Sequence, residues 1–299
     1  MFSKELNAAL SSADLPVRLT GDYHMPHDVQ PLEFFLLREE QRKGKILFDA
    51  PKLRLAEDLT VERLGKPSPL LLERTSYFAS VCTNEAADKE VRLRASRQVQ
   101  FRGIDLCSSA GVLRDLCQSD CSNHIGVSTL AITADGCLIA TIQAAGSAQH
   151  ARRIAPSGSG SADLADFTKG DTLQRLVVRA MERELREECG LPRELPGLTT
   201  FLIGYARLVD RGGKPEFFGL TFLPVMAREM KVRRAEALFV ADHVDHRINR
   251  GALLEDIARL REESTGEFTP AMHIALGFLA DAIAAGNGNL EPLLARRSV

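Results

Sequence analysis

The most regular alternation of apolar and polar positions in the chain lies between residues 171 and 189. Apolar side chains recur there every three or four positions, as on one face of an α-helix; they belong to Leu173, Leu176, Val177, Ala180 and Leu185. Gly190 can adopt the left-handed conformation of a helix end, and Pro192 cannot continue a helix. The pattern predicts a helix over Asp171–Cys189.

Runs rich in apolar and β-branched residues lie on both sides of this helix and predict strands. Turn residues at 134–136 and 211–214 join these strands into two hairpins. The predicted strands cover Ile125–Thr133, Cys137–Gln143, Leu198–Val209 and Glu216–Val225. Two amphipathic patterns, at 251–263 and 269–285, predict the helices that follow.

The first 120 residues carry weaker signals of the same kinds. The predicted elements are a helix over Asp28–Gly44, a hairpin of Ile46–Phe48 with Lys52–Leu55, a strand at Leu70–Arg74 and a short helix within Thr75–Glu85. No catalytic constellation stands out here. We therefore expect a separate N-terminal region, 1–120, in front of a second domain, 121–299.

A segment of glycine and serine, residues 157–161, precedes the predicted helix. Its composition is typical of a flexible linker. Its place between a strand and an acidic helix also suits a loop whose backbone approaches a phosphate or a metal. In the second interpretation Ser157, Gly158 and Gly160 are candidate substrate-binding residues.

Three carboxylates crowd the end of the predicted helix. Glu184, Glu187 and Glu188 stand at i, i+3 and i+4, so they project from one helical face. Like charges at this spacing repel by roughly 0.2–0.5 kcal/mol per pair on an exposed helix. Converging carboxylates are the ligands that Mg²⁺ or Mn²⁺ prefers. A solvated acidic helix end is the alternative interpretation.

The segment Arg183–Leu191 resembles the second half of the Nudix box, R-E-U-x-E-E-x-G-U, where U is a bulky aliphatic residue. Every specified position is filled. The first half is not matched, because Lys169 stands in place of its glycine and Arg175 in place of its glutamate. The family partner of Arg183 is therefore missing, and the acidic replacements nearest in sequence are Asp163, Asp166 and Asp171.

The resemblance implies a Nudix α/β/α sandwich, an α/β (α+β) fold, preceded by the smaller mixed α/β N-terminal domain. It implies a hydrolase that cuts a phosphoanhydride bond in a nucleoside diphosphate linked to another moiety, with Mg²⁺ or Mn²⁺ as cofactor. Glu187 and Glu188 match the family's main metal ligands, Glu184 the third ligand, and Arg183 the arginine that orients them. Many Nudix enzymes are dimers, so a homodimer is a further expectation.

Other residues are candidates for a further carboxylate, a general base and phosphate binding. The family often takes a further carboxylate from a later strand or loop, and loop histidines can act as general bases. In order of preference these candidates are Glu216, then Asp242 and Asp245, with His243 and His246 as bases. Arg152 and Arg153 precede the Gly/Ser segment and are candidate phosphate-binding residues. Ordinary surface positions are an equal alternative for the acidic and histidine candidates.

The front half carries a second, shorter resemblance. Leu47–Leu55, Thr75-Ser76-Tyr77 and Thr83-Asn84 are similar to the N-terminal region of animal Nudix enzymes that hydrolyse UDP-glucose and UDP-galactose. This likeness implies a nucleotide-sugar or related substrate that residues 1–120 help to recognise. ADP-ribose, a dinucleoside polyphosphate and a coenzyme are the alternatives that the sequence leaves open.

Composition narrows the classes of partner. A net charge of −2 with mixed signs gives no basic field for nucleic acid or an anionic membrane, so a small-molecule nucleotide is the expected ligand. No run approaches the roughly 20 apolar residues of a membrane span, and the N-terminal residues lack the apolar core of a signal peptide. We expect a cytoplasmic protein.

Six cysteines in 299 residues do not suggest a disulfide framework. Four residues, Cys107, Cys117, Cys121 and His124, are of zinc-ligand type. The paired short spacings of zinc sites are absent, so core or surface cysteines are the expectation.

A catalytically weak Nudix-fold module that binds a nucleotide is the alternative function. The arginine at position 175 favours it. The three helix carboxylates favour an enzyme, since a binder without metal chemistry would gain by losing their repulsion.

Overall fold

The computed structural model describes residues 1–92, 98–144, 152–232, 236–248, 253–263 and 266–286. The chain forms two compact units. Unit 1 comprises residues 1–126, 161–176 and 205–216, and unit 2 comprises residues 127–160, 177–204 and 217–299. This division follows compactness, and the domain boundary after residue 120 stays a prediction.

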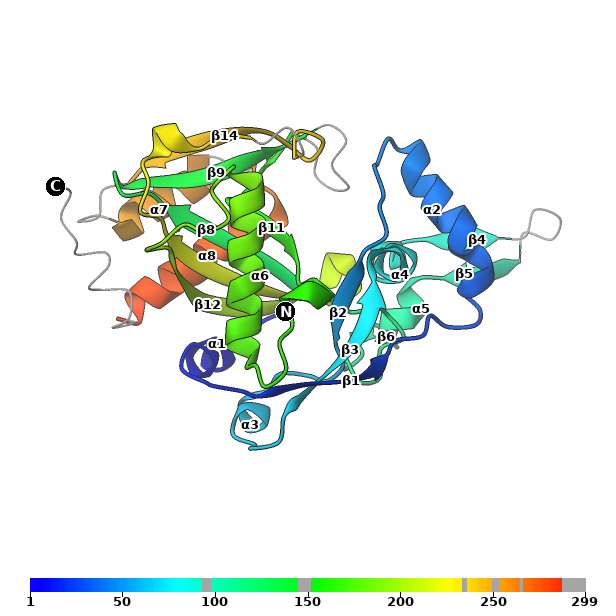
Figure 1. Ribbon diagram of the computed structural model, residues 1–299. Coiled ribbons are helices and arrows are strands. Elements are labelled where there is room, and N and C mark those ends of the chain that lie inside the picture. Colours follow the sequence, from blue (N-terminus) through cyan, green and yellow to red (C-terminus); the bar gives the residue numbers. More distant parts are fainter. Residues whose placement is uncertain (93–97, 145–151, 233–235, 249–252, 264–265, 287–299) are drawn as a thin grey trace. The chain divides into compact units, whose positions relative to one another are not determined.

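Unit 1 contains a three-stranded sheet with the order β1-β3-β2 (Figure 1). Strand β1 (Val17–Asp22) runs parallel to β3 (Leu70–Ser76), and β2 (Pro51–Leu55) pairs antiparallel with β3. Because β1 and β3 are parallel, their carboxyl ends meet at one edge of the sheet. The short strands form two further pairs, β4 (Glu90–Arg92) with β5 (Val99–Arg102) and β6 (Ser108–Ser109) with β7 (Val112–Leu113).

The helices of unit 1 are short, and several begin at a side-chain cap. Ser3, Thr60 and Ser76 each accept a hydrogen bond from a backbone N–H of the first turn. The helices are α1 (Lys4–Leu10), α2 (Glu33–Arg42), α3 (Val61–Leu64), α4 (Tyr77–Cys82) and α5 (Ile104–Cys107). A 3₁₀ turn, Gln30–Leu32, leads into α2, so the helix predicted from Asp28 starts later.

One carboxylate of α2 is buried among lysines. Glu40 is 2% exposed; its Oε1 lies 2.9 Å from Nζ of Lys43 and 2.6 Å from Nζ of Lys89, and Lys45 is a third partner. Burial by itself would raise the pKa of Glu40, but the three ammonium groups lower it to about 2. This cluster ties α2 to the chain that follows α4.

In the described part of the chain, the larger sheet has the order β10-β9-β8-β13-β12, with β11 paired to β8 and β14 to β9. Its strands are β8 (Gly126–Ile132), β9 (Cys137–Gln143), β10 (Ile154–Pro156), β11 (Gly158–Ser161), β12 (Thr199–Leu208), β13 (Lys214–Phe222) and β14 (Val240–Arg247). Ala131 and Ile132 of β8 pair with β9, and β10 pairs with the next residues of β9. The sheet therefore forks beside β9.

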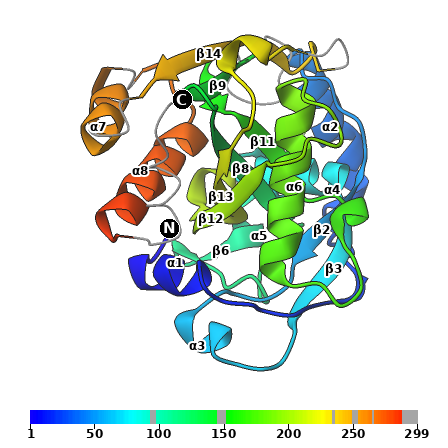
Figure 2. The ribbon, with the colours of Figure 1, turned by 60° about the vertical axis from the view of Figure 1, so that its left-hand side comes forward.

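Helices lie on both faces of the strands of unit 2, as Figures 1 and 2 show. The helices are α6 (Leu173–Glu188), α7 (Leu253–Glu263) and α8 (Pro270–Ala284). Leu185 of α6 joins a core cluster with Ala131 and Ile139 of the sheet. Phe278 of α8 packs edge to face on Phe218 of β13, with ring centroids 5.3 Å apart. Unit 2 thus has a helix–sheet–helix arrangement.

The predicted strands and helices after residue 120 are present, with ends shifted by a few residues. Residues 251 and 252 of the predicted helix 251–263 lie outside the described residues. The hairpin predicted for Ile46–Leu55 is wrong, because Ile46–Phe48 form no strand and β2 pairs with β3 instead. Asp49 gives the reason: its Oδ1 accepts hydrogen bonds from the N–H groups of Ala50 and Phe78, at 3.1 and 2.9 Å. It binds the first turn of α4 rather than closing a hairpin.

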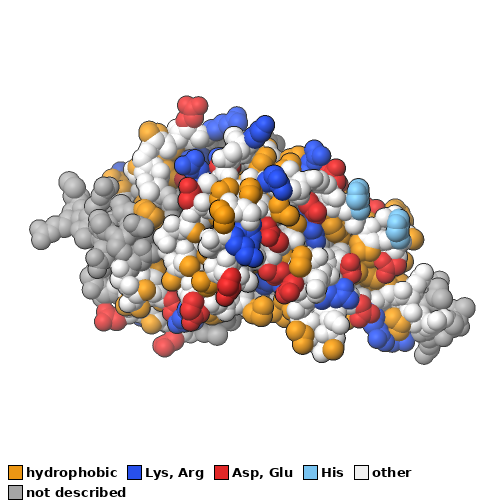
Figure 3. Space-filling view, turned by 90° about the horizontal axis from the view of Figure 1, so that it is seen from below, with side chains coloured by type: hydrophobic (Ala, Val, Ile, Leu, Met, Phe, Trp, Pro, Cys, Tyr) orange, Lys and Arg blue, Asp and Glu red, His pale blue; other side chains and the backbone are white. Residues whose placement is uncertain are grey.

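The surface carries mixed charge. Figure 3 shows basic and acidic side chains interspersed over one face of the molecule. None of the helices in the described residues has the length and apolarity needed to cross a membrane.

Glu40→Gln should destabilise the protein at neutral pH, because it leaves the partly buried ammonium groups of Lys45 and Lys89 without their counter-charge. The lowered pKa of Glu40 adds stability that is present above its ordinary value of 4.5 and is lost as the pH falls towards about 2. The difference in unfolding free energy between wild type and variant should therefore shrink over this range. Urea unfolding from neutral pH downwards measures it, and a pH-independent difference would contradict the assignment.

Candidate functional site

The three glutamates near the end of α6 have different surroundings. Glu188 is 6% exposed, and its Oε2 accepts a 3.2 Å hydrogen bond from the N–H of Ser159 in β11. The side chain of Glu184 is 14% exposed, whereas that of Glu187 is 43% exposed. The helix therefore presents two largely buried carboxylates and one near solvent.

Arg183 links two of these carboxylates. Its Nη1 lies 3.0 Å from Oε1 of Glu184 and 3.2 Å from Oε2 of Glu187. A single guanidinium thus offsets part of the repulsion between them. The orienting role that the resemblance gives to Arg183 fits this geometry and stays a prediction.

Glu188 carries an unfavourable charge. Burial raises its pKa well above the usual range, and the neighbouring Glu184 raises it further, while the hydrogen bond from Ser159 acts in the opposite direction. A bound cation would reverse this balance, because it would stabilise the ionised carboxylates.

The glycines of β11 let its backbone approach α6 closely. A Cβ added to Gly158 would lie 2.7 Å from the backbone N and Cα of Leu185, and one added to Gly160 would lie 2.2 Å from Oε1 of Glu184. The Gly/Ser segment is therefore a strand lying against the acidic helix, which excludes the linker interpretation. It is also not the loop predicted in the other interpretation, because β11 pairs with β8.

Ser157 stands at the fork of the sheet and is fully buried. Its hydroxyl donates to the carbonyl of Ile139 and accepts a 2.7 Å hydrogen bond from the N–H of Ala131. Ser157 therefore joins β9 to β8 where the two strands separate. Its predicted role in substrate binding stays untested.

The C-terminal end of α6 contacts His243, a residue that was predicted to lie in a loop. His243 lies on strand β14, and its Nε2 is 3.0 Å from the carbonyl of Glu188, a position that suits a helix C-terminus. His246 lies on the same strand, as do Asp242 and Asp245, which are exposed. The loop predicted for the two histidines is wrong, because the segment pairs with β9.

Arg152 and Arg153 are exposed at the start of β10. The N–H of Arg152 donates to the carbonyl of Gln143 at the end of β9, and the N–H of Gln143 donates to the carbonyl of Arg153, both at 2.9 Å. Arg153 precedes Ser159 by six positions, which is up to about 20 Å of extended chain. The strand thus places the two arginines at the end of β10 remote from β11.

The three glutamates of α6, Glu184, Glu187 and Glu188, offer the carboxylate oxygens that Mg²⁺ or Mn²⁺ binds. Nevertheless, within the described residues no three His, Cys, Asp or Glu side chains converge closely enough to hold a metal ion. Glu187 is paired with Arg183, whereas Glu188 is bonded to β11. Bringing the carboxylates to one ion requires side-chain rotation, and the ligand set stays a prediction.

Glu216 is a buried acid and not a surface one. It is 2% exposed, and its Oε2 lies 2.6 Å from Nζ of Lys214, which is 1% exposed. Burial lowers the pKa of Lys214 to about 8, although Glu216 opposes this change. Gly126 makes room for the pair, since a Cβ there would lie 1.8 Å from Oε2 of Glu216. The predicted role as base or ligand stays open.

The acids considered as replacements near Arg175 have local partners. Asp163 pairs with Lys52, and Asp166 accepts a 2.8 Å hydrogen bond from the N–H of Asp163. Asp171 accepts a 3.2 Å hydrogen bond from the N–H of Thr172. These bonds shape the turn that leads into α6.

The zinc-type residues of the front half do not form a metal group in the described structure. Cys117 is exposed, whereas Cys107 and Cys121 are buried and belong to one core cluster. Burial lowers the pKa of His124 well below its usual range, so its ring is neutral.

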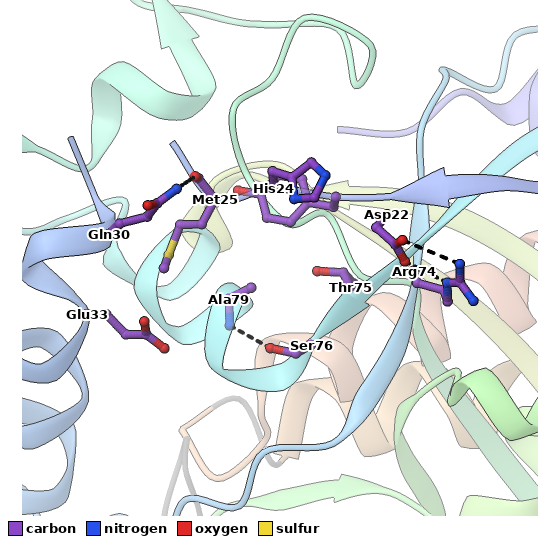
Figure 4. A pocket seen from close by; sticks show the side chains of 10 residues that line it. Asp22, His24, Met25, Gln30, Glu33, Arg74, Thr75, Ser76 and Ala79 are labelled. Atoms are coloured by element: carbon purple, nitrogen blue, oxygen red, sulfur yellow. Dashed lines mark hydrogen bonds and ion pairs between the residues drawn. The ribbon is translucent and has the colours of Figure 1, made fainter. Parts of the chain in front are cut away.

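A cavity that the sequence did not reveal lies in unit 1, at the carboxyl ends of β1 and β3 (Figure 4). Its volume is about 360 Å³, and it is lined by Asp22, Tyr23, His24, Met25, Gln30, Glu33, Arg74, Thr75, Ser76 and Ala79. Asp22 pairs with Arg74 at 2.6 Å. Glu33 enters from the start of α2 and forms no ion pair with the described residues. The parallel pairing that creates this edge was missed because β1 was not predicted.

Comparisons with known proteins give the following. No family profile matches the chain, and no curated protein is a significant match. DR0079 from Deinococcus radiodurans is 15% identical, with 51% of this chain and 80% of that chain covered and a TM-score of 0.34. The MutT protein from Methanosarcina mazei is 14% identical, with 55% of this chain and 95% of that chain covered and a TM-score of 0.33. Tm1382, a candidate Nudix hydrolase, is 13% identical, with 53% of this chain and 70% of that chain covered and a TM-score of 0.32. At such TM-scores these similarities carry no argument about function.

Gly158→Ala should destabilise the protein by about 1–3 kcal/mol, because its Cβ would overlap the backbone of Leu185. Gly266→Ala is the matched control, since nothing lies within 4 Å of its added Cβ. We expect the control to change stability by less than about 1 kcal/mol. Urea denaturation compares the two, and equal effects would show that β11 does not lie against α6.

Proposed function

We propose that the protein is a metal-dependent pyrophosphohydrolase that acts on a nucleoside diphosphate linked to another moiety. The observation that supports this most is the pair of largely buried carboxylates, Glu184 and Glu188, held against β11 beside Arg183. Burying two like charges together is costly unless a cation compensates them.

Glu184, Glu187 and Glu188 would hold the cation, which supplies charge neutralisation for the diphosphate and acidifies a bound water. Arg183 fixes the direction of Glu184 and Glu187 through its ion pairs. The N–H of Ser159 fixes the direction of Glu188 through a hydrogen bond. The side chains must rotate out of these contacts before the three carboxylates can reach one ion.

The alternative, a nucleotide-binding module without turnover, draws support from Arg175 in place of the box glutamate. A binder would gain stability by replacing Glu188, since burial and Glu184 oppose its charge. The retained glutamate therefore favours the enzyme.

We further assign recognition of the moiety linked to the diphosphate to unit 1, and its cavity at β1 and β3 is the candidate site. The uncompensated carboxylate of Glu33 and the polar side chains of Gln30 and Asp22 can accept hydrogen bonds from the hydroxyl groups of a sugar. A nucleotide sugar is the substrate class that fits this lining.

Hydrolysis of UDP-sugars, ADP-ribose, dinucleoside polyphosphates and coenzymes, with Mg²⁺ or Mn²⁺, tests the activity. Glu187→Gln and Glu188→Gln should each lower kcat more than about 100-fold, because even outer partners of a metal are worth 10–100-fold. Glu182→Gln is the control, since this acid of the same helix pairs with Arg186 at 3.1 Å. Absence of turnover, together with a nucleotide that raises the Tm, would favour the binding module.

Glu33→Gln should raise KM for the preferred substrate about tenfold and leave kcat unchanged, because it weakens one charge-assisted hydrogen bond. Glu39→Gln, on the same helix and paired with Arg42 at 2.8 Å, is the control. If Glu33→Gln leaves KM unchanged for every substrate that is turned over, the cavity does not recognise the substrate.

A further inference from the structure

The cavity at the carboxyl ends of β1 and β3 has one side with paired charges and one side with an unpaired negative charge. Asp22 and Arg74 lie on the first side (Figure 4). Arg74 donates to both carboxylate oxygens of Asp22, at 2.6 and 3.4 Å, so these two charges compensate each other. Glu33 lies on the other side and forms no ion pair with the described residues. The Asp, Glu and Arg side chains of the lining therefore sum to one negative charge.

Several hydrogen-bond donors of the lining are already used within the protein. The hydroxyl of Tyr23 donates to the carbonyl of Asp120 at 2.7 Å. The amide nitrogen of Gln30 donates to the carbonyl of Met25, also at 2.7 Å. Together with the guanidinium of Arg74, which is directed at Asp22, these groups leave few donors for a ligand.

Two acceptors of the lining have no such bond. Gln30 and Glu33 are three positions apart, where the 3₁₀ turn leads into α2, so their side chains lie on one face. Figure 4 shows both on the same side of the cavity. Within the part of the chain that the structure describes, neither the amide oxygen of Gln30 nor the carboxylate of Glu33 accepts a hydrogen bond. The cavity thus offers a ligand mainly acceptors and a negative charge.

An ammonium group matches these surroundings better than a hydroxyl group does. It has three donors and no acceptor, whereas a hydroxyl has one donor and two lone pairs that need donors of their own. A hydrogen bond between charged groups is also roughly twice as strong as a neutral one. The side chains of Met25 and Ala79 offer apolar contact to the carbon atoms beside the amine.

We propose that this cavity binds an ammonium group, and that the moiety linked to the diphosphate is an amino sugar. The link to a nucleotide rests on the proposed function, which this inference deepens. The recognition of the amine rests on the lining of the cavity alone.

The test is binding of D-glucosamine, D-glucose and N-acetyl-D-glucosamine to the full-length protein at neutral pH, measured by NMR titration without metal or nucleotide. We expect D-glucosamine to bind at least about tenfold more tightly than the two uncharged sugars, because only D-glucosamine carries the ammonium group. Equal affinities for the three sugars, or no binding of D-glucosamine, would overturn the proposal.

Two variants of α2 locate the charge that is responsible. Glu33→Gln should remove the preference, so that D-glucosamine binds no more tightly than D-glucose. Glu39→Gln should retain it, since Glu39 lies on the same helix and pairs with Arg42 at 2.8 Å. A preference that survives Glu33→Gln would overturn the assignment to this cavity.

Ethanolamine separates the two sources of an ammonium group. If it binds as tightly as D-glucosamine and loses affinity in Glu33→Gln, the amino sugar is overturned in favour of an amino alcohol. None of these measurements needs turnover. Amine binding without hydrolysis of any nucleotide would contradict the proposed function alone, whereas hydrolysis without a preference for the amine would contradict this inference alone.

Discussion

The arrangement of unit 2 depends on how closely the backbone of β11 approaches α6. Gly158 lies against the backbone of Leu185, and Gly160 against the carboxylate of Glu184. A side chain at position 158 does not fit without displacing the helix, and one at position 160 would displace the carboxylate of Glu184. The same approach excludes water from Glu184 and Glu188 and gives Ser159 its contact with Glu188. One packing constraint therefore sets both the position of the helix and the electrostatics of its carboxylates.

The chain buries carboxylates in two contrasting ways. Glu40 and Glu216 each lie beside lysine ammonium groups, and the pKa of Glu40 falls to about 2. Burial raises the pKa of Glu188, and the neighbouring Glu184 raises it further, against the effect of one backbone hydrogen bond. A compensated buried carboxylate leaves an unpaired charge when it is removed, whereas an uncompensated one costs stability and is more typical of a functional site. The surroundings of Glu188 therefore differ from those of the two acids that are paired with lysine.

The elements that were predicted correctly are those whose own residues show a clear helical or strand pattern. The helix over α6 follows from apolar spacing and from Gly190, whose φ of +66° is the left-handed conformation expected at a helix end. The strand pair β8 and β9 follows from β-branched runs around Gly136. Strands β1, β11 and β14 were missed because their sequences are polar or rich in glycine, and pairing with distant strands decides their conformation. The histidines of β14 were assigned to a loop for the same reason.

The sequence by itself determined that three carboxylates and an arginine share one face of a helix, because helical spacing is a local property. It also determined where that helix ends. Only the tertiary structure decided that Glu188 is buried and Glu187 is half-exposed, and that Glu216 is paired with Lys214. Burial and partner choice depend on segments far apart in the chain, and no local pattern encodes which of them will exclude water from a given side chain.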